Sequence, residues 1–446
     1  MYGANVAVVE PHGLDAIDEG ERHGSPRDLF GLWFGANAET ANFAVGILAV
    51  ALYGTSLAGA AAGLLFGSVL GYIAISLVSV AGPRFGLPQM MISRRWFGRA
   101  GNVYPAFLAF LAGVGWFSVD CIFGAQAVGA LLHVPYLVAL ALTLVASIVI
   151  AVYGYNMIHV FERFSAVAML LGFSTIAVVV LAHANLGAPF DAHAPFAAGG
   201  EIGGIAFSAA LAFAYSIGWA PCAADYARYL PASTSSRAVG WWAFAGGFTA
   251  SLSLEILGAA AATAVRGPSI VSATPAETVG LLAGTNGWLA IAGLLTVLIG
   301  TMNGNVMNLY SGALSLLVTF DSSRFPLRLA RWQAALAIGL AGGVLALVGA
   351  DADATARVYG NFLGLLSMWA APWAAIMIAS GKPTTERFGR LALIAWLVGI
   401  AAGVPFWQQT WFVGPIAAAH PQFGDLSYFV SFAVAYAIVA WRGKDG

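Results

Sequence analysis

Apolar residues along the chain gather into runs of about 20 residues, the length that an α-helix needs to cross a lipid bilayer. Short segments with glycine, proline, asparagine or charged residues separate these runs, as turns do. The pattern predicts an all-α polytopic membrane protein with twelve transmembrane helices. The predicted spans are residues 29–54, 57–81, 103–131, 136–154, 162–184, 203–228, 238–264, 287–318, 333–350, 358–380, 389–405 and 427–441.

The composition agrees with a membrane protein, because 60% of the 446 residues are hydrophobic and only 9% are charged. Soluble domains carry about 25% charged residues, and one soluble core could not bury so many long apolar runs. The net charge of −1 and the lack of a basic arm indicate no nucleic-acid partner. Residues 1–28 are polar and acidic, so we expect a cytoplasmic N-terminal tail rather than a cleavable signal peptide.

Lysine and arginine in the connecting segments predict the orientation of the spans. If the N-terminus is cytoplasmic, all of the 19 Lys and Arg residues except Arg266 and Arg357 lie in cytoplasmic segments. We therefore expect a multi-pass protein of the plasma (cytoplasmic) membrane with both termini in the cytoplasm, including a short tail at residues 442–446.

Two predicted helices contain residues that do not suit a continuous membrane helix. Span 203–228 contains Gly-Trp-Ala-Pro at 218–221, and span 29–54 contains Gly-Ala-Asn-Ala-Glu at 35–39. A helix that is interrupted at membrane depth exposes backbone groups that must bind something. In secondary transporters, these groups bind the substrate and the coupling ion.

The two interruptions lie five spans apart, at matching positions of two repeats, residues 29–184 and 203–380. Because five is odd, the repeats have opposite orientations in the membrane and form an inverted repeat. Residues 389–441 supply two further helices outside the repeat. The alternative is that glycine and proline only kink these helices.

Polar side chains at membrane depth are candidates for a binding site. Trp116 and Asp120 lie four residues apart and share one helix face. An indole stacks on a flat ring and a carboxylate accepts N–H groups, so this pair suits a nitrogen-rich heterocycle. Asn303, Asn305 and Asn308 both donate and accept hydrogen bonds. The alternative for these side chains is hydrogen bonding between helices.

Glu39 and Glu255 are acids inside predicted spans without an evident partner, so each is a candidate to carry a coupled proton or to meet a cation. For Glu255, a hydrogen-bonded packing role is an equal alternative. Asp225 and Arg228 are expected to pair with each other or with an inner loop, and the acid–base pair at 162–163 is expected to be similar. Glycines at 59, 63, 67 and 71 form a stripe that predicts close packing against another helix.

Seven stretches of the chain carry a family resemblance. They are Trp-Phe-Gly-Ala-Asn at 33–37, Gly-Pro-Arg-Phe-Gly-Leu-Pro-Gln at 82–89, Ser-Arg-Arg-Trp-Phe-Gly-Arg-Ala-Gly-Asn at 93–102, Val-Gly-Trp-Phe at 114–117, Gly-Trp-Ala-Pro at 218–221, Asp-Tyr-Ala-Arg-Tyr-Leu-Pro at 225–231 and Asn-Leu-Tyr-Ser at 308–311. Together they resemble the nucleobase:cation symporter-1 family, in particular its purine–cytosine permease branch. The resemblance implies the five-plus-five inverted-repeat fold of the sodium-coupled leucine transporters, and cation-coupled import by alternating access.

The resemblance also implies which residues contact the substrate: Trp116, Asp120, Ser216, Gly218, Trp219, Asn305 and Asn308, with Asn37 beside the first interruption. We expect a ring between Trp116 and Trp219, with its edge bound by the polar side chains. Several family members have an amide where this chain has Asp120. Because an ionised carboxylate only accepts hydrogen bonds, we expect cytosine, an aminopurine or a similar amino-bearing heterocycle. The alternative is a small organic cation, either guanidinium-like or a thiamine-precursor pyrimidine.

The coupling ion is expected to be H⁺ or Na⁺, and no other cofactor is expected. The positions that match the sodium ligands of the family are Gly35, Ala38, Ile299, Met302 and Asn303. Met302 and Asn303 stand where serine and threonine are expected, and a thioether is a poor ligand for a hard cation. We therefore favour proton coupling through Glu39, Asp120 or Glu255 over Na⁺ at Gly35, Ala38, Ile299 and Asn303.

Two other classes of membrane protein fit the chain less well. The sequence lacks the His-Glu-x-x-His and Gly-x-Ser-x-Gly motifs of intramembrane or surface hydrolases, so we do not expect an enzyme. Isolated polar groups at membrane depth suit an occluded pocket better than the continuous lining of a channel. We expect a monomer whose partners are the heterocyclic substrate, the coupling cation and the lipid bilayer.

Overall fold

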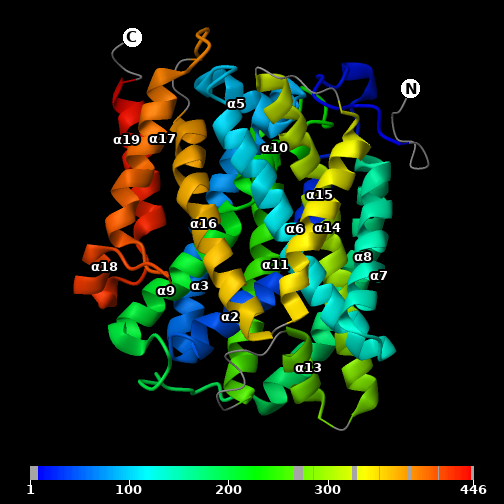
Figure 1. The fold of residues 1–446 in the computed structure, drawn as a ribbon, viewed down its shortest axis with the longest axis vertical. Helices are drawn as coiled ribbons and strands as arrows, with labels where there is room; N and C mark the ends of the chain where they lie inside the picture. Colours follow the sequence, from blue (N-terminus) through cyan, green and yellow to red (C-terminus); the bar gives the residue numbers. More distant parts are fainter. Residues whose placement is uncertain are drawn as a thin grey trace.

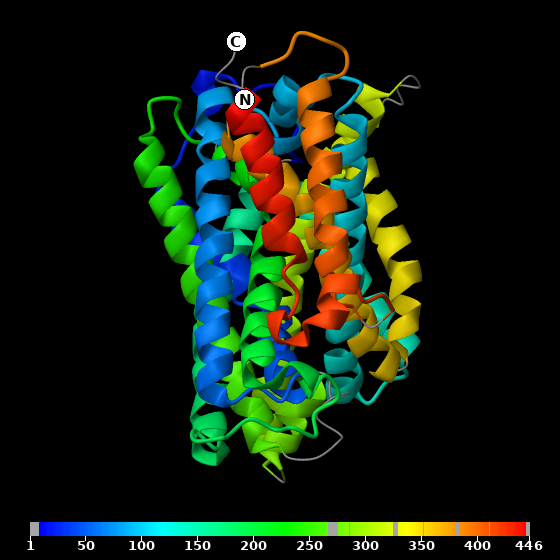
Figure 2. The same ribbon diagram turned by 90° about the vertical axis from the view of Figure 1, so that its left-hand side faces the viewer.

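The computed structural model is a bundle of long helices that run roughly alongside one another (Figure 1 and Figure 2). It describes residues 9–265, 275–284, 286–323, 329–350, 352–379, 383–409 and 411–442. The named secondary-structure elements in these residues are all helical. The prediction of an all-α protein is therefore confirmed.

The helices follow one another in the order of the predicted spans. The α-helices are α1 (Asp28–Asn37), α2 (Thr40–Ala51), α3 (Leu57–Ser79), α4 (Ala81–Phe85), α5 (Gln89–Phe97), α6 (Val103–Leu132), α7 (Tyr136–Tyr153), α8 (Tyr155–His183), α9 (Gly200–Ile217), α10 (Ala223–Ala227), α11 (Ser236–Ala264), α13 (Pro275–Ala283), α14 (Gly287–Ser322), α15 (Arg331–Leu345), α16 (Ala352–Ala379), α17 (Arg390–Gly403), α18 (Pro415–Ala419) and α19 (Ser427–Arg442). Short 3-10 turns are η1 (Glu19–Glu21), η2 (Ala197–Gly199), η3 (Ala220–Cys222), η4 (Ala346–Ala350), η5 (Val404–Phe406) and η6 (Pro421–Phe423).

Nine helical stretches in the described part of the chain are long and apolar enough to cross a membrane. They coincide with the second to the tenth predicted span. Shorter apolar helices at Thr40–Ala51, Arg390–Phe406 and Ser427–Trp441 lie where the first, eleventh and twelfth spans are predicted. The exact number of twelve crossings stays a prediction.

Some helix ends differ from the sequence prediction. Helix α8 begins at Tyr155, two turns before residue 162, where its span is predicted to begin. Polar residues in this first stretch, such as Asn156 and His159, resemble a loop in sequence, yet Asn156 is buried and lies 3.3 Å from the His23 ring. Helices α5 and α13 lie in predicted connections, because nine-residue helices are too short to give the signal of a membrane span.

Both predicted helix interruptions are confirmed. Helix α1 ends at Asn37, Glu39 is extended with φ −131° and ψ 165°, and α2 begins one residue later. Helix α9 ends at Ile217, and the chain passes through η3 before α10 begins at Ala223. The described chain therefore has broken helices at both positions that an inverted repeat relates.

The glycine stripe of α3 packs directly against α9, as predicted. A Cβ added at Gly63 would stand 2.4 Å from the Ile205 carbonyl oxygen, and one at Gly67 would stand 2.1 Å from that of Ala209. The last glycine of the stripe, Gly71, lies against Ser216. Only glycine allows the two backbones to approach this closely.

Replacing Gly67 by alanine is therefore expected to lower the free energy of unfolding by about 1–3 kcal/mol, because the added methyl group meets backbone atoms of α9 that cannot rotate away. Gly31→Ala is the matched control, since a Cβ at Gly31 would have no atom within 4 Å, and alanine is favoured over glycine within a helix. Denaturant unfolding in detergent micelles measures both. Equal stability of the two variants would contradict the close contact between α3 and α9.

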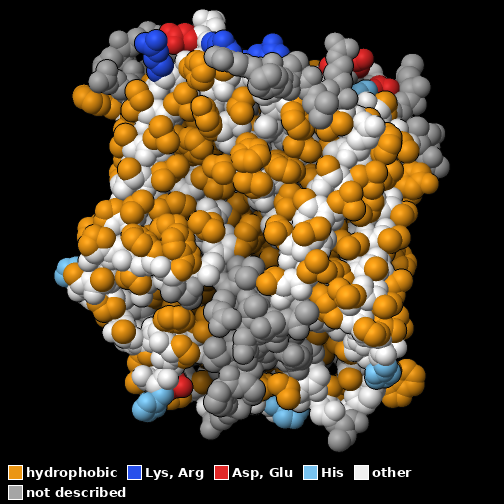
Figure 3. Space-filling view, viewed as in Figure 1, with side chains coloured by type: hydrophobic (Ala, Val, Ile, Leu, Met, Phe, Trp, Pro, Cys, Tyr) orange, Lys and Arg blue, Asp and Glu red, His pale blue; other side chains and the backbone are white. Residues whose placement is uncertain are grey.

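The charged side chains concentrate at one end of the bundle. Figure 3 shows lysine and arginine at one edge of the drawn face and hydrophobic side chains over most of the remainder. The N-terminal segment that precedes α1 and the end of α19 both lie at this basic end (Figure 1). Chain ends on the same side imply an even number of crossings, and the basic end is the one expected in the cytoplasm.

Candidate substrate and cation site

The interruption between α1 and α2 lies in the core, against α9 and α14. Glu39, at this interruption, is buried and accepts a hydrogen bond from the hydroxyl of Tyr215 on α9. Its Oε2 atom has no hydrogen-bond partner and lies over Gly304 of α14. A Cβ at Gly304 would stand 2.1 Å from Glu39 Oε2 and 2.7 Å from Asp120 Oδ2. Because Gly304 has no side chain, an oxygen of each carboxylate lies next to the same position on α14.

Asp120 lies at the middle of α6 and is fully buried. Its Oδ2 accepts a hydrogen bond of 3.0 Å from Nδ2 of Asn308 on α14, and its Oδ1 has no partner. A buried carboxylate with a free acceptor is unfavourable unless a ligand, a cation or a proton meets it. The site therefore offers one oriented acceptor atom to a solute.

Aromatic side chains surround Trp116, one helical turn before Asp120. Its ring centroid lies 5.1 Å from that of Phe362 on α16 and 5.4 Å from that of Tyr215, both at steep angles. Its Nε1 is 3.5 Å from the position of a Cβ on Gly218, where α9 is interrupted. Trp116 therefore lies between Asp120, one turn further along α6, and the interruption of α9 at Gly218.

Trp219 lies just beyond the end of α9 and is also buried. Its ring packs edge-on against Trp33 of α1 at 5.9 Å, and its Nε1 has no hydrogen-bond partner. Both indoles therefore lie near Gly218, but they pack in different aromatic clusters: Trp116 against Tyr215 and Phe362, and Trp219 against Trp33. The sandwich of a ring between these two indoles stays a prediction.

The carbonyl groups at the first interruption face α14, as expected for a cation site. Asn303 Nδ2 donates to the Gly35 carbonyl at 3.3 Å, while Asn303 Oδ1 has no partner. A Cβ at Gly300 would stand 3.4 Å from the Ala38 carbonyl oxygen, while a role of the neighbouring Ile299 in a cation site stays a prediction. Met302 is half-buried and supplies no oxygen ligand.

Glu162 of α8 is a further acid at the first interruption. It is buried, both of its carboxylate oxygens lack partners, and Oε2 would stand 2.1 Å from a Cβ on Gly35. The expectation that Glu162 pairs with Arg163 or with an inner loop is therefore wrong, because its carboxylate has no partner among the described residues and lies inside α8, which begins seven residues before residue 162. Carboxylate, amide and carbonyl oxygens are suitable ligands for a small hard cation, so the residues present fit such an ion.

Two predicted substrate residues, Ser216 and Asn37, already have hydrogen-bond partners in the protein. Ser216 donates to the Ala212 carbonyl at 2.8 Å, within α9. Asn37 accepts from the Tyr72 hydroxyl at 2.7 Å and donates to the Trp33 carbonyl at 2.8 Å. The bond from Tyr72 holds the end of α1 to α3, whereas the other two bonds lie within α9 and α1. Direct contact of Ser216 and Asn37 with a substrate stays a prediction.

Asn305 and Glu255 also have partners outside the pair of carboxylates. The Nδ2 atom of Asn305 lies 3.3 Å from the Ser147 hydroxyl, while its Oδ1 has no partner. Glu255 accepts from the Ser68 hydroxyl of α3 at 2.8 Å. This hydrogen bond is the one that a packing role of Glu255 requires. A part of Glu255 in ion coupling stays a prediction.

Asp225 and Arg228 are expected to pair either with each other or with an inner loop, and the second of these is found. Asp225 accepts a hydrogen bond of 2.7 Å from the backbone N–H of Gln89, in an inner connection. Arg228 pairs at 3.0 Å with Glu10 of the N-terminal segment. Each residue therefore binds a connecting segment, and no ion pair joins the two within the described residues.

Sequence reasoning missed Tyr215, Gly304 and Glu162. Gly304 has a visible signal, because it is a glycine between Asn303 and Asn305 in a polar stretch. Tyr215 has none, since a tyrosine at the end of an apolar run resembles an ordinary core residue. Glu162 becomes a candidate for the site only when the helix is known to begin at Tyr155, because it then lies inside the helix and not at its end.

Two interrupted helices that meet buried acids and aromatic rings define a secondary membrane transporter with discontinuous helices. The chain belongs to the family of permeases for cytosine/purines, uracil, thiamine and allantoin, whose model matches residues 16–380. This membership confirms the predicted family and the prediction of a multi-pass transporter rather than an enzyme.

Similar proteins cover nearly the whole chain. A purine-cytosine permease of Emericella nidulans is 29% identical over 453 residues, which cover 96% of this chain and 87% of that protein. A vitamin B6 transporter of Saccharomyces cerevisiae is 22% identical over 498 residues, covering 95% and 85%. The structure of Mhp1, a nucleobase-cation-symport-1 family transporter closed around bromovinylhydantoin, has a TM-score of 0.75 at 19% identity and covers 97% of this chain and 95% of Mhp1. The predicted transporter fold is therefore confirmed.

Proposed function

We propose that the protein imports an amino-bearing, nucleobase-like heterocycle, such as cytosine or an aminopurine, together with a cation. The observation that carries this proposal is the free Oδ1 of the buried Asp120, one helical turn from Trp116. An acceptor beside an aromatic ring suits a flat solute whose edge donates N–H groups. The name of the Emericella nidulans relative, a purine-cytosine permease, agrees with this solute class.

In the proposed complex, the solute ring stacks on Trp116, with Trp219 towards its other side. Asp120 Oδ1 accepts from the amino group, while Asn308 holds Asp120 Oδ2 in place through its 3.0 Å hydrogen bond. Asn305 Oδ1, which has no partner, is available to the solute edge. Movement of the broken helices α1–α2 and α9–α10 against α6 and α14 exposes the site to one side of the membrane at a time.

We propose the proton as the coupling ion. Glu39 Oε2 and Asp120 Oδ2 both lie beside Gly304, 2.1 Å and 2.7 Å from the position of a Cβ there, and two buried acids that share one small space favour binding a proton or a cation. The thioether of Met302 weakens the sodium alternative, in which the carbonyls of Gly35, Ala38 and Ile299 and the side chains of Asn303 and Glu162 would hold the ion. The protein would act as a monomer in the plasma membrane with both termini in the cytoplasm.

Uptake into proteoliposomes tests both parts of the proposal. With an inward proton gradient and no sodium, we expect accumulation of radiolabelled cytosine or adenine, competed by amino-heterocycles and poorly by uracil. Abolition of uptake on removing sodium at fixed pH would contradict proton coupling alone. Equal competition by uracil would contradict the role of Asp120 as an acceptor.

A second candidate solute is a small organic cation, guanidinium-like or a thiamine-precursor pyrimidine. Glu39 and Asp120 favour it, because neither forms an ion pair with lysine or arginine in the described part of the structure. The same proteoliposomes separate the two candidates, since a permanently charged pyrimidine would then compete better than cytosine.

A further inference from the structure

The basic end of the bundle contains a cavity that transport does not explain. The cavity has a volume of about 290 Å³ and lies between the ends of α3, α4, α5 and α16. Its wall combines Arg84 and Arg95 with apolar and aromatic side chains that include Leu77, Phe85, Trp96 and Pro383. Unlike the transport site, this cavity lies at the surface end of the helices.

Arg84 and Arg95 converge on this cavity from different helices. Their guanidinium carbons lie 5.2 Å and 4.6 Å from the centre of the Phe85 ring, which also lines the cavity. Both arginines are exposed, and neither forms an ion pair with a carboxylate among the residues that the structure describes. The positive charge at this position is therefore available to an anion.

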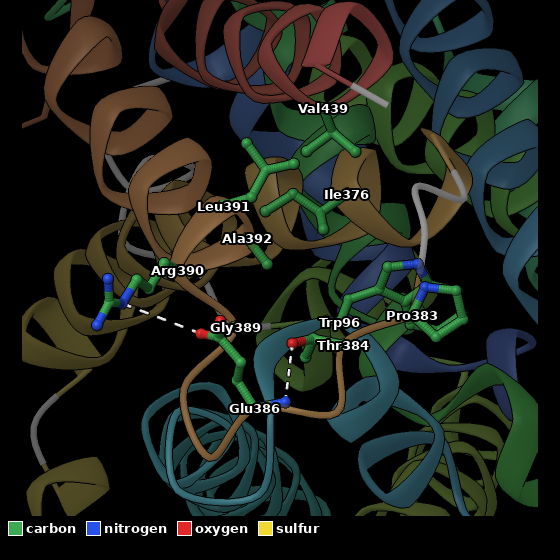
Figure 4. A pocket seen from close by; sticks show the side chains of 10 residues that line it. All are labelled: Trp96, Ile376, Pro383, Thr384, Glu386, Gly389, Arg390, Leu391, Ala392 and Val439. Carbon is green, nitrogen blue, oxygen red and sulfur yellow. Dashed lines mark hydrogen bonds and ion pairs between the residues drawn. The ribbon is translucent and has the colours of Figure 1, made fainter. Parts of the chain in front are cut away.

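A neighbouring cavity, which shares Trp96 and Pro383, gives a direct comparison (Figure 4). There the arginine, Arg390, lies 3.9 Å from Glu386, the ion pair drawn in Figure 4. Among the residues that the structure describes, no acidic side chain lines the cavity of Arg84 and Arg95. Of these two cavities, the one lined by Arg84 and Arg95 therefore has basic side chains without an acidic partner among its described lining residues.

The apolar part of the wall indicates what kind of anion fits. Leu77 is 49% exposed and continues the outward-facing row of α3 that includes Ile73 and Phe66, also exposed. This row belongs to a helix long and apolar enough to cross the membrane, so it faces lipid tails. A ligand that reaches from this row to Arg84 and Arg95 has an acyl chain and an anionic head.

We propose that this cavity binds the phosphate group of an anionic phospholipid, with the phosphate between Arg84 and Arg95 and an acyl chain along Leu77. Basic pockets at the ends of membrane helices bind such headgroups, and each arginine near the surface contributes about fivefold in affinity. Because the cavity joins α3–α5 to α16 and the start of α11, a bound lipid would connect segments from both halves of the chain.

Thermal unfolding of the purified, delipidated full-length protein tests the proposal. Phosphatidylglycerol is expected to raise the unfolding midpoint, while phosphatidylcholine and inorganic phosphate at equal concentration leave it unchanged. In native mass spectrometry, Arg84→Gln with Arg95→Gln is expected to weaken phosphatidylglycerol binding about 30-fold, or about fivefold per arginine. Arg99→Gln is the matched control, since Arg99 is exposed, pairs with Asp321 and lies outside the cavity.

Three outcomes overturn the proposal. Equal binding of phosphatidylcholine would show that the headgroup charge has no role. Stabilisation by inorganic phosphate alone would show a free-anion site without an acyl chain. Unchanged phosphatidylglycerol binding in the double variant, with wild-type elution on gel filtration, would place the lipid elsewhere.

Discussion

Replacing Asp120 by asparagine is expected to lower uptake of an amino-bearing heterocycle by about 10- to 100-fold, the loss of one charge-assisted hydrogen bond. Asn308 Nδ2 already donates to one oxygen of Asp120 at 3.0 Å. In the variant, the single amide oxygen stays with Asn308, so the new NH₂ group points towards the solute. Its amino group then meets a donor instead of an acceptor.

Initial uptake rates in proteoliposomes measure this effect, and the solute itself supplies an internal control. A uracil-like ring presents carbonyl oxygens, so its equilibrium binding to Asp120→Asn, which needs no proton gradient, should be unchanged or tighter than its binding to the wild type. Asp321→Asn is the matched control for an acid-to-amide change, because Asp321 is 44% exposed and pairs with Arg94 at the surface. Unaltered uptake of amino-heterocycles by Asp120→Asn would rule out the acceptor role.

The sequence allows the helix interruptions to be predicted because their signals are local. Glycine, proline and polar residues inside an apolar run disfavour a continuous helix wherever the run packs. The stretches at 35–39 and 218–221 carry these signals, and both are interrupted in the structure. The spacing of Trp116 and Asp120 is local too, so their shared helix face follows from helical periodicity.

Contacts between distant parts of the chain could not be predicted in this way. The hydrogen bond of Tyr215 to Glu39 joins residues 176 positions apart, and nothing near either residue indicates the other. The position of Glu162 depends on where α8 begins, and helix ends are the least certain part of a pattern. The full carboxylate site could therefore be recognised only from the structure, although Asp120 is already a candidate in the sequence.

The N-terminal segment is the largest departure from expectation. It is predicted as a polar cytoplasmic tail, yet Glu10 is fully buried at the basic end of the bundle. Its Oε1 accepts from Arg228 at 3.0 Å, from the Tyr229 hydroxyl at 2.5 Å and from the Tyr310 hydroxyl at 2.9 Å. Its Oε2 accepts from the Tyr155 backbone N–H at 3.0 Å. One carboxylate thus connects the N-terminal segment to α8 and α14 and to the residues after α10.

Two buried arginines depend on this carboxylate for their counter-charge. Arg228 is fully buried, and Arg331 of α15 lies 3.7 Å from Glu10 Oε2 with a side chain only 3% exposed. A buried ion pair contributes little net stability as a pair, but removal of one partner leaves an uncompensated charge. The effect of a substitution at Glu10 should therefore exceed that of any surface acid.

Glu10→Ala is accordingly expected to lower the free energy of unfolding by about 3–5 kcal/mol, measured by denaturant unfolding in detergent micelles. Glu19→Ala is the matched control in the same segment, because Glu19 is 62% exposed and pairs with Arg22 at 3.3 Å, a surface contact of about 0–1 kcal/mol. Hydrogen exchange at residues 9–25 should accelerate in Glu10→Ala and stay slow in Glu19→Ala. Similar stabilities and exchange rates in the two variants would show that Glu10 does not hold the N-terminal segment in place.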